Sequence, residues 1–162
     1  MPTFPAARIR PATVLDAPAI ARAHLQAWRE TYGDLVPAAV YAQREVEGPG
    51  RWEATLAAPG ATMTWVAQRN DEVVGFATAL AAGPSGVRPL QLSRLYVLAA
   101  EQVRRTGTHL LELAIGDAPC FLWVAEANTQ AQGFYRSHGF EADGAREQVA
   151  AGGHLLALRM VR

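Results

Sequence analysis

Apolar side chains recur along the chain with helical spacing in some segments and strand spacing in others. Between residues 16 and 32 they return at the interval of a helix, which predicts one helix there. Residues 62–69 and 72–80 instead favour extended structure and are separated by Asn70 and Asp71, which predicts a β-hairpin. Residues 90–98 predict a third strand. The chain therefore combines hairpins with helical connections.

Gly and Pro residues delimit the remaining elements. Residues 6–11 predict a short edge strand, and the Gly48-Pro49-Gly50 cluster predicts a loop between two short helices at 37–43 and 51–58. The later elements expected are a helix at 106–115, a strand at 121–125, a helix at 128–138, and strands at 140–149 and 154–161 joined across Ala151-Gly152-Gly153. This order implies an α/β fold of the mixed α+β kind. We expect a single mixed, mostly antiparallel sheet of six to seven strands with helices on both faces.

Length and composition indicate one folded domain over residues 1–162. Half of the residues are hydrophobic and 19% are charged, which excludes a disordered chain and allows a full core. Fifteen acidic residues balance fifteen basic residues, so a broad electrostatic nucleic-acid surface is not expected.

Cys120 is the single cysteine, which rules out an intrachain disulfide and a cysteine metal cluster. The first ten residues have no apolar signal-peptide core, and no apolar run approaches the ~18 residues that span a bilayer. We therefore expect a cytoplasmic protein, a monomer or a homodimer, that holds no metal and binds neither membrane nor nucleic acid.

The segment 102–108 joins the strand at 90–98 to the following helix and reads Gln-Val-Arg-Arg-Thr-Gly-Thr. The free N–H groups and the positive dipole end of a helix N-terminus attract phosphate or pyrophosphate. The segment lacks the Gly-Lys-Ser/Thr of a Walker loop and the three glycines of a dinucleotide fingerprint. The alternative is an ordinary strand-to-helix loop with solvated arginines.

Asn128 and Tyr135 lie seven residues apart, so a helix would place both on one face. An amide and a phenol on one face could bind and protonate a group in a cleft. The alternative is that Asn128 caps the helix and Tyr135 is a core aromatic residue.

In combination, these segments resemble the GNAT superfamily of acyl-CoA N-acyltransferases. The motifs Leu-Tyr-Val at 95–97, Gln-x-x-x-x-Gly at 102–107 and Asn-x-x-Ala-x-x-Phe-Tyr-x-x-x-Gly-Phe at 128–140 occur in the order of that family. The resemblance extends over nearly the whole chain. It implies a sheet splayed between the fourth and fifth strands, with acetyl-CoA as acyl donor in the opening. It also implies direct transfer, in a ternary complex, to a primary amine of a small molecule or peptide.

The resemblance further implies roles for individual residues. Tyr135 would protonate the departing thiolate, and a backbone N–H near Val97 would polarise the thioester carbonyl. The residues expected to bind the cofactor are Tyr96, Val97, Leu98, Gln102, Val103, Arg104, Arg105, Thr106, Gly107, Thr108 and Asn128. The residues expected to bind the acceptor are Trp28, Tyr32 and Gln91.

We expect the acceptor pocket between the first helix, the loop after it and the strand at 72–80. Trp28, Tyr32 and Trp52 are candidates for its walls, with core packing as the alternative. Aromatic walls with few acids favour an amine carried on an uncharged or aromatic body.

The chain departs from the family pattern at the expected general base. Gln91 occupies a position where many members carry Glu, and a neutral amide does not accept a proton near neutral pH. A water relay or a backbone carbonyl could replace the Glu, or the substrate differs, or activity is weak. The side-chain candidates for the base are Glu30, Glu126, His24 and His109.

A second departure is Arg105, which stands where the family has the first Gly of its phosphate loop. Gly allows close approach of the backbone to phosphates, so Arg105 is accommodated only if its Cβ points away. Arg104 is the stronger candidate for a phosphate contact.

Two other classes of function remain open. One is an acyl-CoA sensor of the same fold without turnover, which the two departures favour and Tyr135 opposes. The other is a nucleotide- or phosphosugar-binding protein that uses the loop at 102–108 without CoA.

Overall fold

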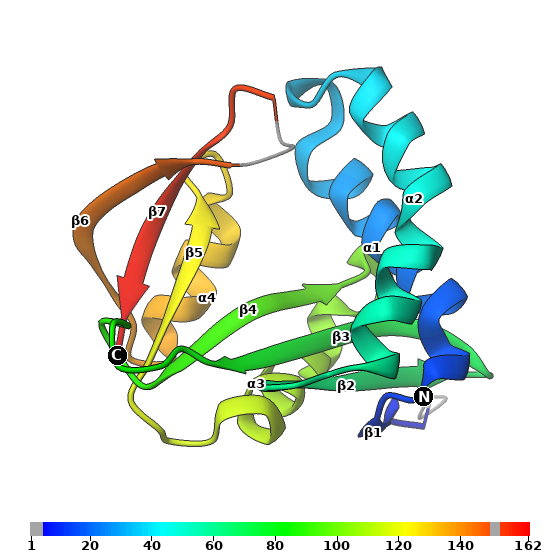
Figure 1. Ribbon diagram of the computed structural model, residues 1–162, viewed down its shortest axis with the longest axis horizontal. Helices are drawn as coiled ribbons and strands as arrows, with labels where there is room; N and C mark the ends of the chain where they lie inside the picture. Colours follow the sequence, from blue (N-terminus) through cyan, green and yellow to red (C-terminus); the bar gives the residue numbers. More distant parts are fainter. Residues whose placement is uncertain (1–4, 150–152) are drawn as a thin grey trace.

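The computed structural model describes residues 5–149 and 153–162, so Ala151 and Gly152 of the expected final turn lie outside the described residues. Seven strands form one sheet in the order β1-β2-β3-β4-β5-β7-β6 (Figure 1). The strands are β1 (Arg8–Pro11), β2 (Thr62–Arg69), β3 (Glu72–Ala81), β4 (Leu90–Val97), β5 (Cys120–Ala125), β6 (Glu141–Gln148) and β7 (Leu156–Val161). The α-helices are α1 (Ala17–Tyr32), α2 (Ala38–Ala57), α3 (Thr106–Ile115) and α4 (Thr129–Ser137). Short 3-10 turns are η1 (Val14–Asp16), η2 (Gly33–Leu35) and η3 (Ala99–Arg104).

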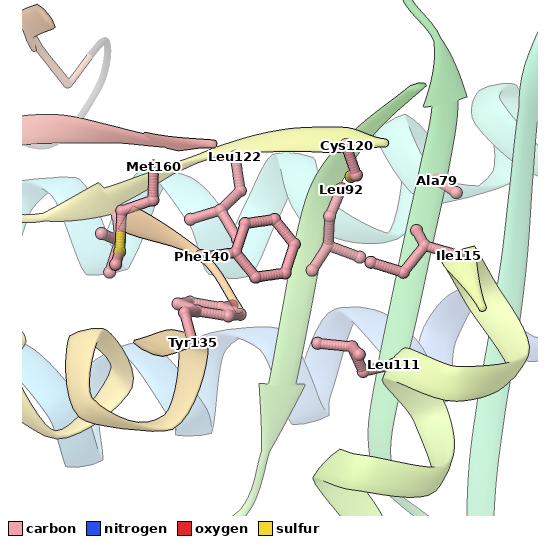
Figure 2. Close-up of a cluster of buried hydrophobic side chains, with 10 residues drawn as sticks. Ala79, Leu92, Leu111, Ile115, Cys120, Leu122, Tyr135, Phe140 and Met160 are labelled. Carbon is pink, nitrogen blue, oxygen red and sulfur yellow. The ribbon is translucent and has the colours of Figure 1, made fainter. Parts of the chain in front are cut away.

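The helices cover both faces of the sheet, as the sequence predicted. On one face, Ile20 of α1 and Trp52 of α2 pack against Val66 and Phe76 of the sheet. On the other face, α3 and α4 enclose a core cluster between β4 and β5, which Figure 2 shows from close by. Among its members are Leu111, Ile115, Tyr135, Leu92 and Leu122.

Polar contacts tie the start of α1 to the edge strand. The Asp16 carboxylate accepts a hydrogen bond from the Thr13 backbone N–H at 2.7 Å and two from the Arg10 guanidinium at 2.8 Å each. The Arg10 hydrogen bonds hold the pKa of Asp16 below its ordinary value although burial acts in the opposite direction. This arrangement fixes where α1 begins, close to the predicted residue.

The prediction of two short helices at 37–43 and 51–58 is wrong, because α2 is one continuous helix through the Gly48-Pro49-Gly50 cluster. An internal proline costs a helix about 3 kcal/mol. Here the cost is offset by packing: Tyr41 and Trp52 are buried on either side of the cluster. A Cβ on Gly48 would lie 3.5 Å from the Ala21 Cβ, so this position brings α2 close to α1.

The sheet opens between its fourth and fifth strands. β4 and β5 are parallel and pair only at Leu90–Leu92 with Cys120–Leu122, after which they diverge (Figure 1). The opposite edge of β4 remains paired with β3 as far as Val97. Between Thr78–Arg94 and Ala79–Leu92 the register shifts by one residue, which makes Ser93 a bulge that bends β4 at the point of divergence.

No helix in the described part of the chain is long and apolar enough to cross a membrane. Among the described residues, no cluster of three or more His, Cys, Asp or Glu side chains could hold a metal ion.

Candidate functional site

A first cleft of about 590 Å³ occupies the opening between β4 and β5, beside the start of α3 and the N-terminal half of α4. It brings together residues that are far apart in the sequence. Those of the expected cofactor set that line it are Tyr96, Val97, Gln102, Val103, Arg105, Gly107, Thr108 and Asn128, together with Tyr135. Leu98, Arg104 and Thr106 are not among the described residues that line it.

Arg105 adopts a left-handed backbone conformation, which favours glycine. Its φ is 61° and its ψ is 10°, in the left-handed region, and it immediately precedes the first residue of α3. Arg105 lines the first cleft, whereas Arg104 lies 4.0 Å from the Glu101 carboxylate. Glu101 is buried and also binds Arg69. The structure therefore puts Arg105, and not Arg104, at the cleft.

Side-chain hydrogen bonds hold the walls of the first cleft in place. The Asn128 Oδ1 accepts from the Ala131 N–H at 3.1 Å, so Asn128 is the N-cap of α4. Burial raises the pKa of the Tyr32 phenol, and the Asn128 side chain acts on it in the opposite direction. The Gln102 Nε2 donates to the Val97 carbonyl at 3.0 Å, while the Gln130 Nε2 donates to the Gln102 Oε1 at 2.9 Å. These bonds connect β4, the loop and α4 across the cleft.

Tyr135 belongs to the core cluster that Figure 2 shows, and it also lines the first cleft. Burial raises the pKa of its phenol, and the neighbouring Tyr96 and Tyr32 raise it further. Tyr135 is therefore a neutral phenol at physiological pH, and its chemistry toward a bound group is donation of a proton.

A second cleft of about 570 Å³ lies between α1, α2 and the sheet. Trp28 and Gln91 line it, as does Trp52, whereas Tyr32 lines the first cleft. The expectation that the strand at 72–80 would form a wall is wrong. The described walls come from α1, α2, β4, β5 and the end of β6, because the face of β3 on this side is covered by α1 and Trp52.

The two clefts adjoin across β4. Four residues line both of them: Ser93, Arg94, Tyr96 and Trp123. The Trp28 Nε1 donates to the Tyr96 phenol oxygen at 3.0 Å, which fixes the position of that phenol at the junction. A group bound in one cleft can therefore meet a group bound in the other beside Tyr96.

Aromatic rings and arginines form the interior of the second cleft. The Arg44 guanidinium lies 3.6 Å from the centre of the Trp28 ring, and that of Arg94 lies 5.1 Å from the centre of the Trp52 ring. The Trp52 Nε1 donates to the His24 Nδ1 at 3.4 Å. Burial lowers the pKa of His24 to about 3, so His24 is neutral at physiological pH.

Of the candidate bases, Glu30 lines the first cleft and His24 lines the second. The Glu30 carboxylate accepts from the Ala99 N–H at 2.8 Å, and that of Glu126 lies 3.3 Å from Arg146. With a pKa of about 3, His24 does not retain a proton taken from an amine, and His109 lines neither cleft.

Sequence reasoning missed Arg44 and Arg94. Arg44 follows Tyr41 by three residues and precedes Gly48 by four, a spacing that puts it on the packed face of a helix. Arg44 was not assigned to a helix face because the predicted helix ended at residue 43, just before it. Arg94 lies two residues before Tyr96 in β4, so the two side chains lie on the same face of the sheet. A charged residue in an otherwise apolar strand was the signal that could have identified Arg94.

Sequence comparison relates the chain to known acetyltransferases. Residues 60–142 match the family model described as an acetyltransferase (GNAT) domain. A probable N-acetyltransferase of Mycobacterium tuberculosis is 32% identical over 148 residues, which cover 85% of this chain and 81% of the relative.

Solved structures show the same fold. The PaiA N-acetyltransferase of Thermoplasma acidophilum, determined in complex with coenzyme A, superposes with a TM-score of 0.72 at 16% identity, covering 96% of this chain and 98% of that one. The ribosomal-protein-alanine N-acetyltransferase of Brucella melitensis gives 0.67 at 25% identity, with coverage of 96% and 98%. With the family match and the mycobacterial relative, these findings establish that the chain belongs to the GNAT acetyltransferase family.

Proposed function

We propose that the protein is an acetyl-CoA-dependent N-acetyltransferase that acts on a primary amine of a small molecule or peptide. The observation that carries the proposal is the open edge of β4, from Ser93 to Val97, beside the N-terminus of α3 in one cleft. Backbone groups along such an edge can bind an extended chain as a further strand would, and the first N–H groups of a helix can bind phosphates.

The residues present fit coenzyme A. A Cβ on Gly107 would lie 3.6 Å from the Phe134 ring and 3.7 Å from Val97, so a larger side chain there would extend into the cleft or against its walls. Arg105 supplies a cation at the same position. In this proposal the N–H groups at the start of α3 and Arg105 hold the pyrophosphate, and the edge of β4 holds the pantetheine arm.

The reaction joins the amine nitrogen to the acetyl carbon and breaks the carbon–sulfur bond of the thioester. The amine loses one proton and the departing thiolate gains one. In the proposal Tyr135 donates to the thiolate, and it is then reprotonated from solvent. A buried phenol is a weak acid, but the same burial disfavours the thiolate and raises its proton affinity as well.

The proton lost by the amine leaves through water or a backbone carbonyl, since the candidate side chains are engaged as described above. This gap in the site is also what favours the second candidate function, an acyl-CoA sensor without turnover. The two candidates differ in what Tyr135 does, because only an enzyme needs its proton.

Calorimetric titration with acetyl-CoA, with ATP as control, tests the cofactor first. One saturable site for acetyl-CoA and none for ATP is expected, and the reverse would indicate a nucleotide site. Release of CoA thiol in a screen of amines then tests turnover.

Tyr135→Phe separates the enzyme from the sensor. The variant should bind acetyl-CoA with unchanged affinity but lose most of the thiol-release rate, by about 10²–10⁴-fold for a general acid. Tyr41→Phe is the matched control, because the Tyr41 phenol binds the Gly33 carbonyl at 2.9 Å and lines neither cleft. Equal rates in wild type and Tyr135→Phe would refute the role of Tyr135. Binding without thiol release from any amine would favour the sensor.

A further inference from the structure

The charges around the second cleft are unevenly distributed. Three arginines line it, Arg44, Arg51 and Arg94, against two carboxylates, Glu47 and Glu147. Glu47 is already paired, since it accepts from Arg51 at 2.5 Å and from the Gln43 amide at 3.0 Å. Glu147 is exposed on β6 at the rim. The interior of the cleft therefore carries excess positive charge from Arg44 and Arg94.

The side chains of these two arginines are half-buried, and no hydrogen bond or ion pair joins either guanidinium to another described residue. The Arg44 Nε is fully shielded from solvent and has no hydrogen-bond partner. Each guanidinium instead lies against a tryptophan ring, Trp28 for Arg44 and Trp52 for Arg94. Stacking of this kind leaves the N–H groups at the edge of the guanidinium plane available to an acceptor.

Two partly buried cations that line one cleft are unfavourable unless an anion compensates them. Burial lowers the pKa of both Arg44 and Arg94, and the charge of Arg94 lowers that of Arg44 further. Two other titratable rings line the described part of this cleft, and neither supplies a negative charge: burial lowers the pKa of His24 to about 3 and raises that of the Tyr96 phenol, so both rings are neutral. The described residues provide no internal compensation for this pair.

We propose that the second cleft binds the acceptor amine through an anionic group, a carboxylate or a phosphate, that accepts hydrogen bonds from Arg44 and Arg94. The proposal rests on the acetyltransferase function and names the substrate class of that enzyme. It differs from the expectation of an uncharged or aromatic body, which was drawn from the aromatic walls and the few acids near them. The rings position the arginines, and the arginines select the ligand.

The position of Arg94 adds a constraint on the substrate. Arg94 lines both clefts and lies two residues from Tyr96, whose phenol stands at the junction. The anionic group bound by Arg94 is therefore near the place where the amine must meet the thioester. Molecules in which the amine and the anionic group are a few bonds apart, such as free amino acids, satisfy this constraint. The volume of the second cleft, about 570 Å³, is in the range that holds small ligands.

The test compares acceptors that differ only in charge. Thiol release from acetyl-CoA is measured with the free amino acids and with their amides, and with O-phosphoethanolamine and ethanolamine. We expect the anionic member of at least one pair to be preferred in kcat/KM by about tenfold or more, the loss expected for a charge-assisted hydrogen bond. Preference within the amino acid pairs identifies a carboxylate, and preference for O-phosphoethanolamine identifies a phosphate.

Arg44→Met and Arg94→Met should abolish that preference, with Arg44→Gln and Arg94→Gln as second variants if the first fold poorly. Arg22→Met is the matched control, because Arg22 is exposed on α1 and lines neither cleft. Equal or better use of the neutral partners by wild type, or a preference that survives in both Arg44 and Arg94 variants, overturns the proposal. Neither result affects the acetyltransferase function.

A binding measurement keeps the inference testable if no amine is acetylated. Three of the four tryptophans, Trp28, Trp52 and Trp123, line the second cleft, so their fluorescence reports its occupancy. N-acetyl amino acids are titrated against their amides, and O-phosphoethanolamine against ethanolamine. Saturable binding of the anionic members alone supports anion selection if the double variant Arg44→Met, Arg94→Met loses it. This holds even if the proposed reaction is not observed. Binding of neither member of the pairs, or of both equally, overturns it.

Discussion

Arg105→Gly should stabilise the protein while weakening its affinity for acetyl-CoA. Arg105 has a φ of 61°, where the Cβ of an L-residue is crowded at a cost of about 1–2 kcal/mol. Glycine removes this crowding but gives the unfolded chain more freedom, which takes back about 0.4–1 kcal/mol. The net expectation is a gain of about 0.5–1 kcal/mol in the free energy of unfolding.

Urea unfolding of the ligand-free protein, followed by tryptophan fluorescence, measures this gain. Arg105→Ala is the decisive control, because alanine loses the guanidinium but keeps the crowded backbone and should show no gain. Asp71→Gly is a second control. Asp71 has a φ of 63° in the turn between β2 and β3, far from both clefts, so this variant should be stabilised without any change in acetyl-CoA affinity.

The reasoning is refuted if Arg105→Gly is no more stable than wild type, or if Arg105→Ala gains as much as the glycine variant. In the first case the left-handed backbone carries no penalty that glycine relieves. In the second, the stability change comes from the side chain. Calorimetry with acetyl-CoA is a separate reading, in which both Arg105 variants should lose affinity by a similar factor because both lack the guanidinium.

Two further predictions concern His24 and Gly107. Unfolded His24 takes up a proton near its ordinary pKa of 6.5, whereas folded His24 stays neutral down to about pH 3, so its contribution to stability is lost as the pH falls through this window. Between pH 7 and pH 5 the loss in the free energy of unfolding is about 2 kcal/mol. His24→Asn should remove this loss from the pH dependence of urea unfolding. His109→Gln, at an exposed position, is the control and should leave the pH dependence unchanged. A dependence that is the same in wild type and His24→Asn contradicts the buried neutral ring. Gly107→Leu should abolish acetyl-CoA binding in calorimetry while the circular dichroism spectrum stays unchanged. Gly107→Ala should still bind acetyl-CoA, since its Cβ would lie 3.6 Å from the nearest neighbour. Full affinity in the leucine variant would contradict the proposed position of the cofactor.

Local periodicity was enough to predict most of the elements, because their boundaries depend on residues next to one another. The helix at 106–115 was predicted at its observed bounds, and the hairpin at 62–80 needed only the Asn70-Asp71 turn. The splayed sheet was inferred from the family resemblance alone. Its physical cause, the Ser93 bulge and the pairing that ends at Leu92, depends on strand register, which no local pattern encodes.

Two of the remaining differences involve contacts between distant segments, and a third depends on backbone torsion. The helix α2 continues through Pro49 because α1 packs against it at Gly48, and a local reading gives the proline more weight than that packing. The same error removed Arg44 from any helix face and so concealed the charge of the second cleft. The sequence also did not indicate which of the adjacent residues Arg104 and Arg105 lines the first cleft, because this depends on backbone torsion, here the left-handed Arg105.

The unpaired edge of β4 also bears on strand pairing between molecules. An exposed strand edge is a template on which a strand from another molecule can add, and natural sheets cover or distort such edges. Here the edge lines a cleft that residues of β5, α3 and α4 also line. We expect these neighbours to admit an extended ligand and to obstruct a strand that is attached to another folded molecule. The divergence that opens the sheet to its ligand therefore also protects the edge from intermolecular pairing.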